Sequence, residues 1–412
     1  MSDTGKPVGP IPAGYETRDG ELAVDGQTAS QLVELAGRTP LFVYSSAMMS
    51  RRVADLRAAM PDRLKINYAI KANSFAPVLK HMAGLVDGLD IASGGELDMV
   101  RAAGVDCARV SFAGPGKRDS ELENAIRHGA TLNLESEGEA ERALAIAERL
   151  GTAPRLAIRV NPDFELKGSG MKMGGGAKPF GVDAERVPAL ARRIVDAGAE
   201  WRGLHIFTGS QALDADAVID AQANVLDLAQ RIVEKAGVSL PKLNMGGGLG
   251  IPYFPGDTPI DAQRIGAALE ERFATRADTM ADTEFYIELG RYLVGEAGVY
   301  LTRIVDRKVS HGETYLITDG GLHHQLAASG NFGTVVRRNY PVAIATRFGE
   351  DRAEIANVVG CLCTPLDRLA DKAHLPRAEV GDIVAVFCAG AYGASASPSA
   401  FLGQGPAAEI MV

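Results

Sequence analysis

The sequence is poor in cysteine, and this limits both disulfide and metal chemistry. Its 412 residues include four cysteines, Cys107, Cys361, Cys363 and Cys388. Their number and irregular spacing do not suit a disulfide framework. The close pair Cys361 and Cys363 has no second pair to complete a zinc site. We therefore expect reduced thiols and predict no metal site.

Two further absences restrict location and partners. No stretch reaches the ~18 consecutive apolar residues of a membrane-spanning helix, and the polar residues 1–14 lack the apolar core of a signal peptide. Both absences favour a cytoplasmic protein. Positive charge is also scarce, because 43 Lys and Arg stand against 52 Asp and Glu and no basic stripe occurs. An acidic chain repels phosphate backbones, so we expect no nucleic-acid partner.

The chain does contain a regular alternation of short apolar runs and amphipathic helical stretches. Eight runs are predicted to be strands, at 65–70, 88–91, 109–112, 131–134, 156–160, 203–207, 242–245 and 285–287. Helices are predicted between them, including 95–103, 120–128, 137–150, 187–197, 215–236 and 260–275. This alternation predicts an α/β fold, a (β/α)8 or TIM barrel. An open doubly wound sheet is the weaker alternative, because no dinucleotide-type glycine motif follows the first strand.

A second domain is expected because 412 residues exceed the usual size of a single core. Strand-like runs at 299–308, 313–318, 342–347, 355–359, 382–387 and 409–412 are linked by turns with little helix. We predict that residues 41–293 form the barrel and that 294–412 form a mostly β domain. Residues 1–40, with a short strand at 21–24, are predicted to join that β domain.

Reactive residues of such barrels lie at the carboxyl ends of the strands, and here those ends are polar. Lys71 follows the first strand, where its amine could enter a cavity as a nucleophile or Schiff-base partner. The alternative is a lysine that extends to solvent. The later strand ends supply further polar residues and glycines: Asp90, Arg159, His205, Ser210, Gly246, Gly247, Gly248, Glu288, Gly290 and Arg291.

Two of these strand ends suggest a phosphorylated cofactor. Three adjacent glycines after the seventh strand leave backbone N–H groups bare, and Ser210 and Arg291 add a hydroxyl and a cation. A simple tight turn is the alternative. A phosphate site, a strand-end lysine and the strand-end carboxylate of Glu288 together suit pyridoxal phosphate, whose pyridine nitrogen a carboxylate keeps protonated. A salt bridge between Glu288 and Arg291 is the alternative role for that carboxylate.

Several motifs resemble those of the alanine-racemase-type barrel decarboxylases that act on diaminopimelate, ornithine and arginine. The motifs occur in order along nearly the whole chain: Tyr68-Ala-Ile-Lys71-Ala-Asn73, Asp90-Ile-Ala-Ser93-Gly-Gly-Glu96, Phe112-Ala-Gly-Pro115-Gly-Lys117, Gly209-Ser210-Gln211, Gly246-Gly-Gly248, Glu288-Leu-Gly-Arg291, Cys361-Leu-Cys363-Thr364-Pro365 and Gly390-Ala-Tyr392-Gly393. The resemblance implies a lyase of amino acid metabolism that uses pyridoxal 5′-phosphate.

The resemblance also implies roles for individual residues. Lys71 is the expected Schiff-base lysine, Glu288 the pyridinium partner, and Cys363 the group that returns a proton after CO2 leaves. The expected cofactor ligands further include Asp90, His205, Phe207, Ser210, Gly246, Gly247, Gly248, Gly290, Arg291 and Tyr392. Cys363 is expected to reach the site from a second subunit, which implies a homodimer with shared active sites. Without the resemblance, Cys363 is more simply a buried structural thiol.

The substrate region departs from that family's pattern. Thr364 follows Cys363 where relatives that use diamino acids have an acidic residue for the distal amine. Phe207 stands where a histidine commonly stacks on the cofactor ring, and His205 is expected to pack beneath the site. Arg159, Thr364, His323 and His324 are the candidate substrate-binding residues, although His323 and His324 would point to opposite faces of any strand.

A narrower branch is also resembled, the decarboxylases of amino acids tethered to an acyl-carrier protein and those encoded with exosortase systems. Its features here include Asn161-Pro162-Asp163, His323-His324 and Ser397-Pro398. A tethered substrate has no distal ammonium, and the basic loop 167–178 could dock an acidic carrier; an ordinary lid is the alternative. We expect decarboxylation of a free or carrier-bound amino acid. A free diaminopimelate, ornithine or lysine decarboxylase, a racemase and a non-catalytic binding protein are the alternatives.

Overall fold

The computed structural model describes residues 5–166, 168, 170–275, 280–330 and 338–412. These residues form two compact units, and each unit gathers segments that are distant in the sequence. One unit comprises Val53–Gly250 and Pro259–Gly290. The other comprises Met1–Arg52, Ile251–Thr258 and Arg291–Val412.

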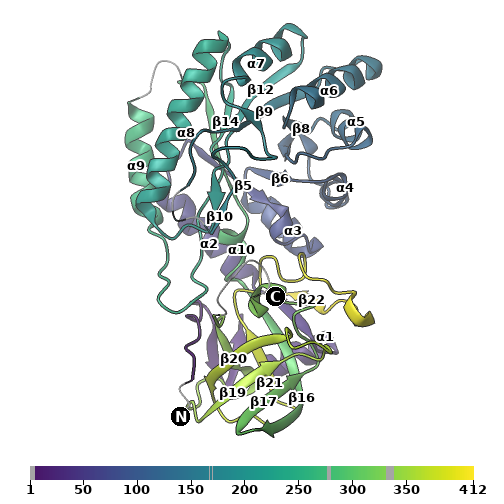
Figure 1. Ribbon diagram of the computed structural model, residues 1–412, viewed down its shortest axis with the longest axis vertical. Helices are drawn as coiled ribbons and strands as arrows, with labels where there is room; N and C mark the ends of the chain where they lie inside the picture. Colours follow the sequence, from purple (N-terminus) through teal and green to yellow (C-terminus); the bar gives the residue numbers. More distant parts are fainter. Residues whose placement is uncertain (1–4, 167, 169, 276–279, 331–337) are drawn as a thin grey trace. The chain divides into compact units, whose positions relative to one another are not determined.

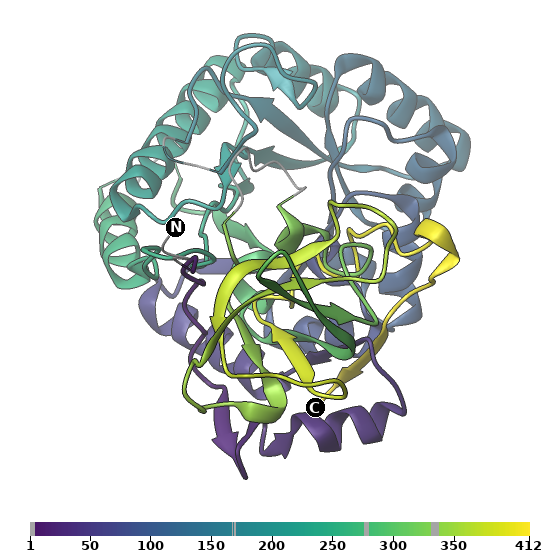
Figure 2. The ribbon, with the colours of Figure 1, turned by 60° about the horizontal axis from the view of Figure 1, so that its bottom comes forward.

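The first unit is a closed barrel of eight parallel strands with helices outside them (Figures 1 and 2). In order around the barrel the strands are β5 (Leu64–Ala69), β6 (Gly88–Ile91), β7 (Val110–Phe112), β8 (Thr131–Leu134), β9 (Arg155–Asn161), β12 (Glu200–His205), β14 (Lys242–Asn244) and β15 (Glu284–Leu289). Pairing of β15 with β5 and of β8 with β9 closes the ring. The predicted (β/α)8 barrel is confirmed.

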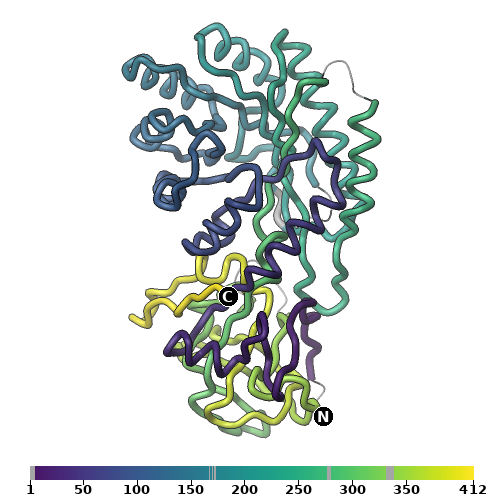
Figure 3. Tube along the Cα trace, turned by 180° about the vertical axis from the view of Figure 1, so that it is seen from behind, coloured from purple at the N-terminus to yellow at the C-terminus, as the bar shows by residue number. Residues whose placement is uncertain are grey.

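Several helices of the barrel unit begin or end at recognisable capping residues. They are α3 (Ala76–Leu85), α4 (Gly94–Ala102), α5 (Asp119–Arg127), α6 (Glu137–Leu150), α7 (Val187–Asp196), α8 (Ala215–Ala236) and α9 (Ala262–Ala274). The Ser136 side chain caps α6, and Gly237 ends α8 with a φ of 66°. The helices α8 and α9 lie side by side (Figure 3). Within the described ranges, no helix combines the length and apolarity needed to cross a lipid bilayer.

The second unit is mostly β, as predicted. Its main sheet has the order β18 (Val342–Ile344), β21 (Ile383–Val386), β16 (Gly298–Ser310), β17 (Glu313–Thr318), β19 (Glu354–Val359) and β20 (Arg368–Leu375). Strand β4 (Leu41–Tyr44) pairs with both β16 and β22 (Ala408–Met411). A three-stranded sheet of β1 (Glu16–Arg18), β2 (Glu21–Val24) and β3 (Gln27–Thr28) precedes helix α1 (Ala29–Ala36).

The boundaries of the units differ from the expected 41 and 293. Because β4 pairs with β16 and β22, the β unit keeps the chain as far as Arg52, within helix α2 (Ser46–Ala59). It also takes Ile251–Thr258, a segment expected in the barrel, and begins again at Arg291, where α10 (Arg291–Val294) starts. The described residues 5–40 belong to the β unit.

Candidate active site

Polar side chains meet inside the barrel near the carboxyl ends of its strands. Asn67 Nδ2 donates to Asp90 Oδ1 at 3.2 Å, and Asn244 Nδ2 donates to Glu288 Oε2 at 3.1 Å. Each bond joins residues of different barrel strands. Buried polar groups of this kind cost stability unless they are paired, so their concentration at one end indicates a functional site.

Glu288 is the best-defined charged group of this site. Its side chain is 9% exposed, and its Oε2 lies 2.9 Å from His205 Nε2. Burial alone raises the pKa of Glu288, but the charges of His205, Lys71 and Arg159 outweigh it and lower the pKa to about 2. The carboxylate is therefore ionised at neutral pH, as a partner for a protonated pyridine nitrogen must be.

Lys71 lies in the short 3-10 turn η1 (Ile70–Ala72), directly after β5. Its charge is among those that lower the pKa of Glu288, so the amine and the carboxylate share one electrostatic environment. Gly290 packs tightly beside this turn, because a Cβ there would lie 2.8 Å from the Ala72 Cβ. The predicted lysine, carboxylate and glycine thus come together at neighbouring strands.

Asp90 lies on β6 next to this group and is buried. Burial first, and then the charge of Glu288, raises the pKa of Asp90 to about 8, although Lys242 opposes the shift. Its Oδ2 has no hydrogen-bond partner among the described residues. Asp90 therefore holds its proton near neutral pH and can act as a donor.

The glycine turn after β14 is shaped by close contact with β15. A Cβ on Gly247 would lie 2.0 Å from the Glu288 carbonyl oxygen, and Gly246 and Gly248 have φ values of 70° and 105°. Within the described residues, the N–H groups of Gly247 and Gly248 donate to no acceptor. Phe207 packs against this turn, since a Cβ on Gly246 would lie 3.0 Å from its ring. The turn therefore fits an anion, and an aromatic face lies beside it.

Ser210 lies on the short strand β13 (Gly209–Ser210), which pairs with β10 (Met171–Lys172). It is half-buried, and the next residue, Gln211, has a φ of 62°. Positive φ at a residue other than glycine is strained, and such strain is concentrated at functional sites. The predicted loop 167–178 lies partly outside the described residues, because Lys167 and Ser169 are not among them.

Arg159, a predicted substrate ligand, already has a charged partner. Its Nη1 lies 2.9 Å from Glu135 Oε1, and its guanidinium lies 4.8 Å from the Phe180 ring centroid. Sequence reasoning missed Glu135, whose position after the fourth barrel strand was the available signal. The prediction for Arg159 identified its place at the strand end but not this ion pair.

In the β unit, Arg291 and Tyr392 lie together. The Arg291 guanidinium carbon is 4.9 Å from the Tyr392 ring centroid, and Nη1 donates to the Tyr253 hydroxyl at 2.8 Å. No carboxylate pairs with Arg291 in the part of the chain that the structure describes. Tyr392 has a φ of 57°, another strained position. A half-buried cation without a carboxylate suits an anionic ligand.

Cys363 lies in the loop between β19 and β20 and is exposed. The Asp367 carboxylate shapes this loop by accepting the Leu362 N–H at 2.8 Å and the Leu322 N–H at 2.7 Å. Thr364, the next residue after Cys363, is half-buried. The alternative interpretation of Cys363 as a buried structural thiol is wrong for this chain.

His323 and His324 lie on a turn after β17 rather than on a strand. Their rings are 3.8 Å apart, so the expectation that they point to opposite faces does not hold. His324 bonds through Nδ1 to the Tyr300 hydroxyl and through Nε2 to the Gly405 carbonyl oxygen, each at 3.0 Å. Burial, followed by the neighbouring His323, lowers the pKa of His324 to about 4. Neither ring nitrogen of His323 has a partner among the described residues.

Comparisons with known proteins agree with this chemistry. Residues 46–295 match the family described as pyridoxal-dependent decarboxylase, pyridoxal binding domain. The chain is 35% identical to an L-glutamyl-(BtrI acyl-carrier protein) decarboxylase of Niallia circulans, over 90% of this chain and 88% of that protein. It is 33% identical to a diaminopimelate decarboxylase of Aquifex aeolicus, over 96% of this chain and 92% of that protein.

A solved structure is similar over both units. The crystal structure of diaminopimelate decarboxylase from M. jannaschii in complex with L-lysine aligns with a TM-score of 0.86 and 25% identity. The alignment covers 97% of this chain and 93% of that one. The chain therefore belongs to the pyridoxal-dependent decarboxylases, carboxy-lyases that use pyridoxal phosphate to release CO2 from amino acids.

Proposed function

We propose that this chain removes the α-carboxyl group of an amino acid held as an acyl group on a carrier protein. The decarboxylase chemistry is supported above all by Glu288, a buried carboxylate kept ionised in the electrostatic environment of Lys71. When bound, the cofactor supplies an electron-withdrawing pyridinium ring. Lys71 is proposed to hold the cofactor covalently, and Glu288 to hold the proton on the ring nitrogen.

The phosphate group is proposed to accept the free N–H groups of Gly247 and Gly248, with Gly246 shaping the turn and Ser210 donating its hydroxyl. Arg291 and Tyr392 are proposed to contribute a cation and a hydroxyl, in line with the family resemblance. Phe207 is proposed to cover one ring face, His205 and Asp90 to support the ring through Glu288, and Gly290 to leave room beside Lys71. The unpaired amides and the strained residues Gln211 and Tyr392 support these roles.

Cys363 is proposed to return a proton to the substrate carbon after CO2 leaves. The thiol is exposed in the isolated chain, which supports a role in a site shared with a second copy. We accordingly propose a homodimer with shared active sites, and a cytoplasmic location.

The substrate assignment depends on the residues that follow Cys363. Thr364, Pro365 and Leu366 carry no charge, and the Asp367 carboxylate is occupied by two backbone N–H groups. This loop therefore offers no carboxylate for a distal ammonium, which disfavours a free diamino acid. Similarity to a protein named for glutamyl carrier substrates points the same way. Of the two neighbouring histidines, His323 is buried, and its ring nitrogens have no partner among the described residues; we propose that they serve a polar substrate group in the assembled site.

The test is CO2 release from a panel of substrates. Glutamyl and related aminoacyl groups loaded on a carrier protein are compared with free glutamate, lysine, ornithine and diaminopimelate, with a Lys71→Ala variant as the blank. We expect turnover of a carrier-bound group and little turnover of the free amino acids. Comparable or faster turnover of a free diamino acid would overturn the carrier proposal in favour of the second candidate, a diaminopimelate-type decarboxylase. A product of inverted configuration without CO2 would indicate a racemase.

A further inference from the structure

Four charged side chains are buried together beside the candidate active site. Three of them follow the third and fourth barrel strands, and the fourth lies near the carboxyl end of the fifth strand, β9: Lys117, Glu135, Glu139 and Arg159. Their exposed fractions are 1%, 2%, 2% and 7%, respectively. We refer to these four residues as the buried network. Two cations and two carboxylates balance in charge, as burial of ions requires.

The ammonium group of Lys117 makes three hydrogen bonds. Its ammonium donates to Glu139 Oε1 at 2.7 Å, to the Gly114 carbonyl oxygen at 2.7 Å and to the Asn133 carbonyl oxygen at 2.9 Å. Three donors therefore meet three acceptors. The other oxygen of Glu139 accepts the backbone N–H of Glu135 at 3.3 Å, which links this pair to the next one.

Glu135 is held on three sides. Its Oε1 accepts the Gly114 N–H at 2.6 Å and Arg159 Nη1 at 2.9 Å, and its Oε2 accepts the Gly181 N–H at 2.7 Å. The loops after β7 and β9 are thus tied to one carboxylate. Neither of its oxygens can turn without breaking such a bond, so the position of the Arg159 guanidinium is fixed.

Arg159 in turn acts on Glu288. Its charge is one of those that keep Glu288 ionised, together with the charges of His205 and Lys71. Asp90 also interacts with Glu288, and Lys242 in turn acts on Asp90. The geometry agrees, because Arg159 is paired in register with His205 of the neighbouring strand β12, and His205 Nε2 lies 2.9 Å from Glu288 Oε2. The guanidinium is thus bound to Glu135 and lies one strand away from the group that contacts Glu288. The Glu135 carboxylate already balances the charge of Arg159, so its attraction for a substrate carboxylate is weaker than that of an unpaired arginine.

We infer that the buried network is a positioning device: Glu135, held in place by Lys117 and Glu139, fixes Arg159 so that its charge sets the potential at Glu288. Arg159 then tunes the bound cofactor and does not bind the substrate. This inference rests on the proposed role of Glu288 but not on the identity of the substrate.

The test uses substrate-free holoenzyme and follows the pH midpoint of the cofactor's visible absorbance change. Glu135→Gln leaves the Arg159 charge uncompensated, so we expect a lower midpoint, by at least half a pH unit. Arg159→Met removes the cation, so we expect a higher midpoint. In the double variant E135Q/R159M both charges are gone and the midpoint should return towards wild type. The conservative Glu135→Asp should keep the wild-type value.

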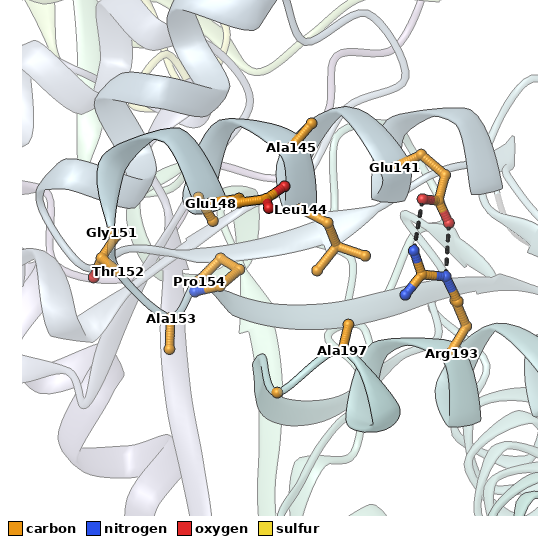
Figure 4. A pocket seen from close by; sticks show the side chains of 12 residues that line it. Glu141, Leu144, Ala145, Glu148, Gly151, Thr152, Ala153, Pro154, Arg193 and Ala197 are labelled. Carbon is orange, nitrogen blue, oxygen red and sulfur yellow. Dashed lines mark hydrogen bonds and ion pairs between the residues drawn. The ribbon is translucent and has the colours of Figure 1, made fainter.

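The matched control is Glu141→Gln, on helix α6, which begins just after Glu135 and contains Glu139. Glu141 pairs with Arg193 of α7 at 2.9 Å on the barrel surface, beside an open hollow between the two helices (Figure 4). This variant should leave the midpoint unchanged. If Glu135→Gln does not fold, Glu139→Gln gives the same test one step further away, with a smaller shift of the same sign.

Steady-state kinetics separate positioning from substrate binding. With any substrate that is turned over, Arg159→Met should lower kcat at least tenfold and change KM less than twofold. A large rise in KM with unchanged kcat, or equal midpoints in all variants, would overturn the inference. Because the absorbance titration needs no substrate, it stands even if the carrier proposal fails. A wild-type protein without cofactor absorbance would instead refute the proposed function itself.

Discussion

The two units bury different kinds of side chain. The core of the β unit is apolar where β4, β16 and β21 pack, with Leu41, Val43, Leu301, Ile383 and Ala385 all buried. The barrel buries charged groups near the carboxyl ends of its strands, including Glu288 and the four residues of the buried network. Apolar burial stabilises a fold directly, whereas buried ions contribute little net stability and are kept for what they do. The contrast predicts that core substitutions in the β unit will lower stability without changing catalysis, whereas substitutions of the charged groups in the barrel will change catalysis.

The largest effect is expected for Lys71→Ala. Lys71 is exposed on a short turn after β5, so its truncation, including the loss of its charge near Glu288, should change the free energy of unfolding by about 1 kcal/mol or less. Loss of a covalent catalytic group should lower turnover by roughly 10³-fold or more. Absorbance spectra of the purified variant should also lack the band of covalently held cofactor. Thermal melting of the protein without cofactor provides the stability control, and a band identical to wild type would contradict the assignment.

Breaking the buried network should instead lower both the free energy of unfolding and the rate of turnover. Lys117→Met leaves the Glu139 carboxylate buried without its cation, and we expect a loss of about 3–5 kcal/mol in the free energy of unfolding. The surface pair of Glu141 and Arg193 should be worth about 0–1 kcal/mol when Glu141→Gln breaks it. Urea unfolding of both variants measures the difference.

The double variant K117M/E139L makes this comparison sharper. Replacing both ions with apolar groups removes the uncompensated charge, so stability should recover relative to Lys117→Met alone. The single variant Glu139→Leu completes the comparison. If the loss of stability in the double variant equals the sum of the losses in the two single variants, the two residues are not coupled and the network description is wrong.

In the β unit, a core truncation should reduce stability and leave the chemistry intact. Leu301 is fully buried in β16, and Leu301→Ala should cost about 2–5 kcal/mol through lost burial and the cavity that remains. The cofactor absorbance of the folded fraction should keep the wild-type pH midpoint. Urea unfolding and the absorbance titration measure the two quantities separately, and a shifted midpoint would show that the core of this unit also tunes the barrel site.

Local sequence pattern was sufficient where an element is continuous and regular. The strands β6 and β8 and the helices α6 and α8 agree with the predicted bounds, because an apolar run or a helical repeat ends at a clear cap or turn. Strand β20 was missed because register shifts interrupt its pairing with β19 and Lys372 has a φ of 48°, so the period of two is broken. The resemblance supplied Lys71 and Glu288 as candidates.

Contacts between separate loops were beyond the reach of local pattern. Nothing in the sequence around Glu135 indicates that its carboxylate meets Gly114, Arg159 and Gly181, which lie on three different segments. The contact of His205 with Glu288 was missed for the same reason, since it joins β12 to β15, which are separated by β14. Strand β4 was placed in the wrong unit because its partners β16 and β22 lie more than 250 residues further along the chain.

The smallest expected effect concerns acid stability. In the folded chain the pKa of Glu288 is about 2, below its ordinary value of 4.5, so the folded state binds this proton less tightly than the unfolded state. Its contribution is therefore fully present above about pH 4.5 and is lost as the pH falls through 2, with an upper limit of about 3 kcal/mol. Urea unfolding without cofactor, at pH values from 6 to 2, should show a steeper loss for wild type than for Glu288→Gln. Because His205 Nε2 lies 2.9 Å from Glu288 Oε2 and its charge helps to lower the pKa of Glu288, an additional His205→Gln variant should flatten the same profile. Equal slopes in all three proteins would mean that the charges around Glu288 do not lower its pKa. The buried charges of the barrel would then not differ in this respect from the rest of the molecule.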